Sequence, residues 1–403
     1  MKLRRKTRFV CVSDTHAYTP SEAGFKLPAG DVLIHAGDLT NHGSAAELRK
    51  TMSWIATADF EVKIIICGSS SSRQDCQILG LQVRSLLSER ATGNHDITLD
   101  PGFYAEHGSS FHGQHLEDTQ KCLEIVTQAS PSIVYLRHQS ALIRLTRPNG
   151  PKTIFKVFGS PYSQSSGTWA YGYESSNAGA LWNSIPLDTD ITVTHTPPNS
   201  HCDSRVEGIS VGCTALRGAL SKVRPSLAIC GHVHESRGSE RVRWYTSQAS
   251  SSQTVDVQGH KDPVILPPPG SKKQSLVDLT GKKAPKLDNN QFAGNNLRAP
   301  VSQLFQSSQN ALLLPSSGRP SDGFQGSEAD QSTSSSVPLC LDERHTGNED
   351  GPCLRRRETC IVNAAIVATS WPHRGGKRFH APIVVDLELP VWEEENGGSE
   401  PHG

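Results

Sequence analysis

The chain has 403 residues, and its 40 Lys and Arg balance its 40 Asp and Glu, so the formal net charge is zero and no nucleic-acid-binding patch is expected. Its ten cysteines form neither a C-x-x-C motif nor a paired framework, which disfavours a disulfide-stabilised secreted protein. No apolar stretch reaches membrane-spanning length, and the basic segment 2–6 leads directly into an apolar run, so we expect a cytoplasmic protein without membrane contact.

The first two expected strands each lead into a carboxylate. The apolar run 9–12 precedes Asp14 and His16, and the run 32–34 precedes Asp38. Both runs have the length of fully buried strands. Because ligand sites in open α/β sheets lie beyond the carboxyl ends of the strands, we expect these side chains to share one crevice.

A helix and a third strand follow. Ser44 and Glu47 form a capping box, in which Ser44 caps the helix and Glu47 reaches back to it. Apolar residues then recur at helical spacing through 48–55, which predicts an amphipathic helix packed on a sheet. The apolar run 62–67 is the third expected strand.

Residues 69–92 separate this strand from Asn94 and His95. The segment begins with four serines and continues with apolar residues that suit an amphipathic helix on a protruding loop. Nothing in it carries chemistry, so we expect an insertion without function, of the kind that translation of an unspliced intron would produce. Asn94 offers a neutral amide oxygen, and His95, which points elsewhere, is free to handle protons.

Two more expected strands lead into histidines. The run 191–194 ends at His195, and the run 227–230 leads into His232 and His234. In extended backbone, residues two apart project to the same side, so the last two imidazoles can converge on one metal site.

The candidate ligands favour a pair of divalent transition-metal ions. They are Asp14, His16, Asp38, Asn94, His195, His232 and His234. Imidazole together with carboxylate suits Mn²⁺, Fe²⁺/Fe³⁺ or Zn²⁺, whereas an all-oxygen set would favour Mg²⁺ or Ca²⁺. No cysteine belongs to the set, which disfavours a structural thiolate zinc site. Asp38, alone on its loop, is the expected bridge between two ions that polarise a phosphoryl group.

Each motif alone also has a plainer interpretation. A single Asp-x-His or Gly-Asp is more often a turn than a ligand, and most of the seventeen histidines should serve no site. His35 is expected in the core, and His201 either lines a pocket beside His195 or is structural. Four aromatic residues either border the substrate or pack an intervening loop: Trp169, Tyr171, Tyr173 and Trp182.

Residues 248–355 form a polar, low-complexity tract. Its apolar content is too low to offset the entropy of ordering, so we expect a disordered insertion there. Order is expected to return in 356–392, with two strands that pair with 241–245 and close the second sheet. Residues 393–403 are expected to be a disordered tail.

The motif order resembles the calcineurin-like metallophosphoesterase superfamily. The motifs are Asp14-x-His16, Gly37-Asp38, Gly93-Asn94-His95-Asp96, His195 and Gly231-His232-x-His234. Segments 158–162, 194–198 and 231–235 resemble more narrowly its metallophosphoesterase-domain-containing branch, common in fungi and animals. The resemblance covers about residues 7–247 and resumes near 358–392. It implies an α/β (α+β) metallo-dependent phosphatase fold, a four-layer αββα sandwich of two mixed β-sheets.

The resemblance also implies a role for each candidate. Asp14, His16 and His234 would hold the first metal, Asp38 would bridge, and Asn94, His195 and His232 would complete the second. His95 would lie near the leaving-group oxygen and protonate it or stabilise its charge.

These expectations indicate a dinuclear metal-dependent phosphoesterase. The narrower branch is associated with cyclic-nucleotide and related phosphodiester cleavage, so we expect a phosphodiesterase that uses a metal-bridging hydroxide on a small phosphoester or nucleotide. One alternative is a low-activity nucleotide-binding regulator or scaffold on the same fold, which the interruption before Asn94 favours. Another is a protein serine/threonine phosphatase, which shares the metal centre, although nothing specifies a phosphopeptide groove.

Overall fold

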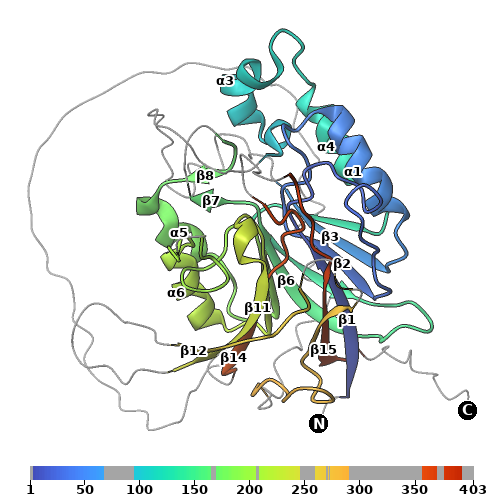
Figure 1. Ribbon diagram of the computed structural model, residues 1–403, viewed down its shortest axis with the longest axis vertical. Coiled ribbons are helices and arrows are strands. Elements are labelled where there is room, and N and C mark those ends of the chain that lie inside the picture. Colours follow the sequence, from blue (N-terminus) through green and yellow to red (C-terminus); the bar gives the residue numbers. More distant parts are fainter. Residues whose placement is uncertain are drawn as a thin grey trace, which may run out of the picture. The chain divides into compact units, whose positions relative to one another are not determined.

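Two large β-sheets pack face to face and carry helices on their outer faces (Figure 1). The computed structural model describes residues 3–67, 95–164, 169–205, 208–245, 259–268, 271, 273–289, 356–369 and 376–392. They belong to one compact unit of the chain. The predicted αββα sandwich of two mixed sheets is therefore confirmed.

The first sheet contains the three N-terminal strands of the sequence prediction. Its order is β13 (Ser275–Asp278), β15 (Ile383–Pro390), β1 (Arg4–Val12), β2 (Val32–His35), β3 (Val62–Ile66) and β4 (Ile133–Leu136). Strands β1 to β4 are parallel, so their carboxyl ends meet at one edge, while β15 runs antiparallel to β1.

The second sheet contains the two histidine-bearing strands. Its order is β12 (Gly259–Pro263), β11 (Gly238–Trp244), β14 (Glu358–Asn363), β10 (Leu227–Cys230), β9 (Ile191–Thr194), β6 (Ile154–Ser160) and β5 (Gln139–Arg144). Strands β6, β9, β10 and β14 are parallel. A separate pair, β7 (Ser163–Gln164) and β8 (Gly172–Tyr173), lies outside both sheets.

The core between the sheets is built from alternate strand residues. Phe9 of β1 and Phe155 of β6 meet edge to face across it, with ring centroids 5.5 Å apart. Ile34 and Ile64 of the first sheet share this layer with Val193 of the second, and all are fully buried. Because neighbouring residues of a strand face opposite sides, the adjacent apolar residues serve the helix layers instead.

Helices cover both outer faces. Against the first sheet lie α1 (Ala45–Thr57), α3 (Pro101–His112) and α4 (Thr119–Thr127), with the short η1 (Ile97–Leu99). Against the second lie α5 (Ala178–Trp182) and α6 (Thr214–Val223). Single-turn helices η2 (Ser175–Asn177) and η3 (His234–Ser236) complete the set in the described residues. The predicted capping box of α1 is present, with Ser44 as N-cap and Glu47 reaching back.

The two C-terminal strands separate between the sheets. Strand β14 pairs with β11, as predicted, but β15 pairs with β1 and so belongs to the first sheet. The expectation that both would pair with 241–245 was wrong. The reason lies in the two apolar faces of β15, because Val385 packs between the sheets while Val384 packs under the helix layer.

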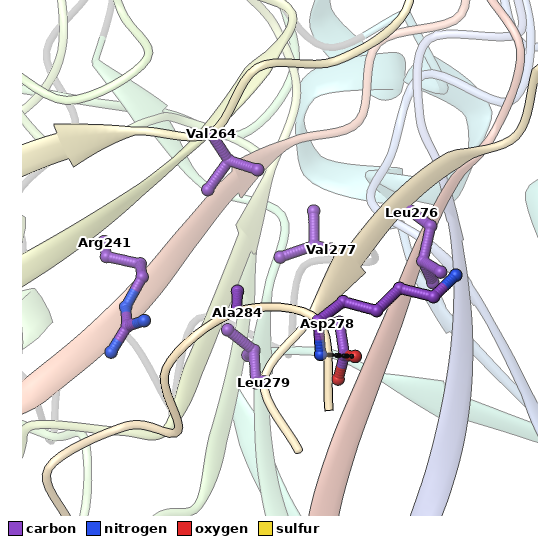
Figure 2. A pocket seen from close by; sticks show the side chains of 8 residues that line it. Arg241, Val264, Leu276, Val277, Asp278, Leu279 and Ala284 are labelled. Carbon is purple, nitrogen blue, oxygen red and sulfur yellow. Dashed lines mark hydrogen bonds between the residues drawn. The ribbon is translucent and has the colours of Figure 1, made fainter. Parts of the chain in front are cut away.

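Strands β12 and β13 lie within residues expected to be disordered. They extend both sheets, since β12 pairs with β11 and β13 pairs with β15. Val277 and Leu279 are almost fully buried, so β13 and the residue after it bring apolar side chains to the core, whereas Ile265 of the same tract is exposed. A cavity of about 190 Å³ lies beside β13. Asp278 borders it and accepts a hydrogen bond from the backbone of Lys283 (2.9 Å), and Figure 2 shows the lining side chains.

None of the helices in the described residues combines the length and the apolar character that crossing a membrane requires.

Candidate metal centre

Loops at the carboxyl ends of four strands bring the predicted ligands together. Asp14 and His16 follow β1, Asp38 follows β2, and His195 follows β9. His232 and His234 follow β10, and His95 enters from the segment before η1. Three overlapping groups have ligand atoms within 4.8 Å of one another: Asp14, His16 and His234; His16, Asp38 and His95; and Asp14, Asp38 and His195.

The two carboxylates lie at the middle of the cluster. Oδ2 of Asp38 is 3.4 Å from Nε2 of His195 and 3.9 Å from Nε2 of His16. Oδ1 of Asp14 is 3.4 Å from Nε2 of His234. Asp38 therefore faces histidines from both sheets, which is the position expected of a bridging ligand.

Four histidines are held in the same way. Nδ1 of each donates to a backbone carbonyl, which leaves Nε2 turned toward the carboxylates. The pairs are His16 with Thr40 (3.1 Å), His95 with Asn41 (2.6 Å), His195 with Ala36 (2.9 Å) and His234 with Thr369 (3.3 Å). Such carbonyl contacts commonly orient metal-ligating imidazoles, so the donor set fits a metal centre.

Ring nitrogens also face one another. Nε2 of His16 lies 3.3 Å from Nε2 of His234, and Nε2 of His195 lies 3.3 Å from Nδ1 of His232. Since His16 and His234 already use Nδ1 as the donor, each facing Nε2 presents a lone pair when its ring is neutral. A cation between them would satisfy both.

The carboxylates are ionised. Burial alone would raise the pKa of Asp14, but the hydrogen bond to His234 and the charges of His234 and His195 hold it well below its usual value. Burial likewise opposes ionisation of Asp38, and the charges of His195 and His95 outweigh it, so the pKa of Asp38 is also well below normal. Two buried anionic carboxylates close together favour divalent cations.

The histidines divide into two protonation classes. Burial and neighbouring histidine charge lower the pKa of both His16 and His232 to about 3, so both rings are neutral at pH 7. Burial also disfavours the charged form of His195, but the carboxylate of Asp38 outweighs it and raises its pKa to about 10. His195 therefore carries a proton that a metal ion would have to displace.

Two glycines leave room for these contacts. Gly37 has φ +97°, and a Cβ there would lie 2.6 Å from Nδ1 of His195. A Cβ at Gly231 would overlap the side chains of Ser13 and Asp14. Glycine is required at both positions because, at each, the backbone of a loop from one sheet lies against a side chain from a loop of the other sheet.

The backbone is strained at several candidate ligands. Positive φ angles occur at Asp14 (53°), His16 (45°), Asp38 (54°) and His232 (69°). Non-glycine residues adopt this region at an energetic cost, and such residues cluster at functional sites. Four of the eleven non-glycine residues with positive φ in the described part of the chain are thus candidate ligands.

Sequence reasoning missed two residues that hold the centre together. The carboxyl of Asp96 accepts hydrogen bonds from the backbone of Leu39 (3.1 Å) and Thr40 (2.9 Å), which fixes the loop of Asp38. Burial and the charge of Asp38 raise the pKa of Asp96 to about 7. Its place in the Gly-Asn-His-Asp motif was the available signal.

Asn41 is the second such residue. Its carbonyl receives Nδ1 of His95, and its side-chain amide donates to the backbone of His16 (2.9 Å) and to Glu47 (2.9 Å). The capping box of α1 is therefore connected to the centre. No sequence pattern marks Asn41, because its role depends on a backbone carbonyl.

Several candidates lie elsewhere. Asn94 and the segment 69–92 fall outside the described residues. His201 is structural, since it contacts Glu240 (3.1 Å) and packs against Trp244. His35 is fully buried beside Thr15, as expected of a core histidine. Tyr173 and Trp182 pack in the outer helix layer of the second sheet.

Comparisons with known proteins agree with this geometry. The family model of calcineurin-like phosphoesterases matches residues 7–236. The chain is 35% identical over 261 residues to "Probable rhamnogalacturonate lyase C" of Emericella nidulans, covering 63% of this chain and 20% of that protein. It is 30% identical over 267 residues to "Metallophosphoesterase domain-containing protein 1" of Homo sapiens, covering 64% of this chain and 70% of that protein.

A UPF0046 protein of Caenorhabditis elegans is 28% identical over 277 residues, which cover 67% of this chain and 84% of that protein. This chain spans only a fifth of the length of the Emericella protein. It spans most of the length of the human and nematode proteins.

Proposed function

Because this chain belongs to the calcineurin-like phosphoesterase family, we propose that it is a metal-dependent phosphodiesterase that hydrolyses small phosphodiesters such as cyclic nucleotides. Family membership and the candidate ligands support the coarser activity, a metal-dependent phosphoesterase. The observation that carries the proposal is the convergence of ring nitrogens from both sheets on the carboxylates of Asp14 and Asp38. The preference for diesters rests on the resemblance to the narrower branch.

The ligands divide into two sets around a shared carboxylate. Asp14, His16 and His234 would hold one ion, as their ligand atoms lie within 4.8 Å of one another. Asp38 would bridge to a second ion held by His195 and His232, to which Asn94 would add its amide oxygen. Two divalent ions, of Mn²⁺, Fe²⁺/Fe³⁺ or Zn²⁺, would polarise the phosphoryl group and provide a hydroxide near neutral pH.

His95 is placed to act on the leaving group. Its Nδ1 donates to the carbonyl of Asn41, and its Nε2 faces Oδ2 of Asp38 at 4.0 Å. The ring is 22% exposed, more than Asp38 at 4%, so it borders both the centre and the side open to substrate. A protonated ring in this position would donate its Nε2 proton to the departing oxygen.

The proposal is tested with purified protein and bis(4-nitrophenyl) phosphate. We expect hydrolysis with added Mn²⁺, and loss of that activity in Asp38→Asn. Equal rates in the wild type and the variant would refute the proposal. Calorimetric nucleotide binding without turnover under Mn²⁺, Fe²⁺ or Zn²⁺ would support the alternative of a nucleotide-binding regulator.

A further inference from the structure

The ring of His95 is enclosed on two sides by other rings. The ring of His16 meets it edge to face, with centroids 4.7 Å apart, and the indole of Trp169 lies at 4.2 Å with the planes inclined by 46°. His16 is itself a candidate metal ligand. Trp169 therefore provides the contact with His95 that can be altered without changing a candidate ligand.

The indole of Trp169 is itself packed against helix α3. Its ring lies 5.4 Å from the ring of Phe111 in α3, and Phe111 lies 6.1 Å from Phe103 of the same helix. Aromatic pairs at these separations are attractive and resist displacement. The indole is thus held between a helix and the imidazole of His95.

The segment after Trp169 is joined to the turn that follows His95. The backbone N–H of Tyr171 donates to Asp100 (3.3 Å), and the Tyr171 hydroxyl donates to the carbonyl of Asp96 (3.3 Å). Ala170 and Tyr171 are both buried. Because both segments are fixed to residues 96–100, the separation between indole and imidazole is fixed as well.

We propose that Trp169 is a positioning residue that keeps Nε2 of His95 directed at the leaving-group oxygen. The inference rests on the proposed role of His95. The single hydrogen bond from Nδ1 to Asn41 leaves the ring able to pivot about that contact, since the outer torsion of histidine has broad minima. The indole of Trp169 blocks this rotation of the His95 ring.

The consequence depends on the leaving group. A 4-nitrophenolate departs readily without a proton, whereas phenolate and alkoxides need one, and general-acid catalysis contributes about 10²–10⁴-fold where it is needed. Trp169→Ala should lower kcat for a phenyl phosphodiester about 10-fold or more, because displacement of a catalytic group is costly. With the 4-nitrophenyl diester the loss should be less than about 3-fold, and KM should change little for both.

Two further measurements separate positioning from structural damage. Metal content should equal that of the wild type, and carbethoxylation of His95, followed by peptide mass spectrometry, should be faster in the variant because one ring face is uncovered. Trp169→Phe, which keeps an aromatic face, should restore most of the phenyl-ester activity. Trp392→Ala removes a tryptophan whose indole bonds to Leu145 (2.8 Å) and should leave the ratio of the two rates unchanged.

An equal loss on both esters, or an unchanged rate of His95 modification, would overturn the inference. If Trp169→Ala does not fold, Trp169→Leu takes its place, since it keeps apolar bulk without an aromatic face. If the wild type hydrolyses neither ester, the proposed function fails, and the modification rate alone decides whether Trp169 positions His95.

Discussion

Glu358 and Asp38 are both carboxylates with little exposed side chain, 8% and 4%, yet they are surrounded in opposite ways. Glu358 accepts from the guanidinium groups of Arg241 (2.7 Å) and Arg243 (2.8 Å) and from the backbone of Asp288 (2.8 Å). Each contact pairs a donor with an acceptor, and two guanidinium groups face the single carboxylate. This cluster joins β11 to β14 and to the segment after β13 that contains Asp288.

The metal centre does not alternate in this way. Around Asp14 and Asp38, the ring nitrogens of His16 and His234 face one another at 3.3 Å. In the described residues both carboxylates have histidines as ion-pair partners, with no lysine or arginine among them. The lesson is that buried charge alone does not mark a functional site. In a matched cluster such as that of Glu358, every hydrogen-bond acceptor has a donor, and the cluster stabilises the fold. In a cluster such as that of Asp14 and Asp38, several acceptor atoms converge, and a bound metal cation is required to satisfy them.

The largest expected effect is that of Asp38→Asn. The amide cannot carry the negative charge that both ions would share, and metal ions contribute several kcal/mol to phosphoryl transfer, so kcat/KM should fall about 10³-fold. The assay is hydrolysis of bis(4-nitrophenyl) phosphate with Mn²⁺, with circular dichroism to verify folding. Glu358→Gln is the matched control, and a comparable fall there would erase the distinction between the clusters.

Glu358→Ala should have the opposite effect to Asp38→Asn, because it should lower stability and leave activity unchanged. Removing the carboxylate takes away the ion-pair partner of Arg241, whose guanidinium still donates to the carbonyls of Pro285 and Lys286. The free energy of unfolding should fall by about 2 kcal/mol, a value reduced because Arg243 is half exposed to water. Urea denaturation measures the loss, while kcat should remain near the wild-type value. An unchanged urea midpoint would show that the matched cluster contributes nothing to stability.

The strands that carry the ligands could be predicted from the sequence because their signals are local. Each of the runs 9–12, 32–34, 62–67, 191–194 and 227–230 is short and mainly apolar or β-branched, and each corresponds to a strand. A parallel arrangement then places their carboxyl ends at one edge. The positions of Asp38 and His195 within the centre followed from that reasoning.

The remaining features depend on contacts between distant segments. Strand β15 joined the first sheet because both of its faces are apolar, but a buried run does not specify its partner. Strand β13 was missed because average composition hides a few well-placed apolar residues, and β12 was missed because its run 259–263 has no apolar pattern at all. The carbonyl of Asn41 was beyond prediction, since every residue has a carbonyl and only the fold decides which histidine it meets.

Metal binding should release protons, and the pKa values indicate which histidines supply them. The pKa of His195 is raised to about 10 by Asp38, so its proton is present at pH 7 and must leave when the ring binds a metal ion. His234, whose pKa is also raised, contributes in the same sense, whereas His16 and His232 are already neutral. Apparent affinity should therefore rise with pH, by about tenfold per unit for each proton released.

Calorimetric titration of the metal-free protein with Mn²⁺, in buffers of different ionisation enthalpy, counts these protons. On the order of one to two should be released at pH 7. Constant affinity between pH 6 and pH 8 would mean that the histidines do not bind the ion, and the centre would then resemble the matched cluster.

The smallest expected effect concerns the N-terminal cap of α1. This cap is a second matched cluster, and Asn41 connects it to the metal centre. Ser44 accepts from the backbone of Glu47 (3.2 Å), and the Glu47 carboxylate also holds the backbone of His42 (3.1 Å) and the amide of Asn41. Ser44→Ala should cost about 1 kcal/mol, which lowers Tm by about 2–4 °C. Because Glu47 keeps its bonds to Asn41, the carbonyl that orients His95 should stay in place and kcat should change less than about 2-fold. Differential scanning calorimetry with parallel kinetics tests this, and a tenfold fall in kcat would show that the cap and the centre act as one unit.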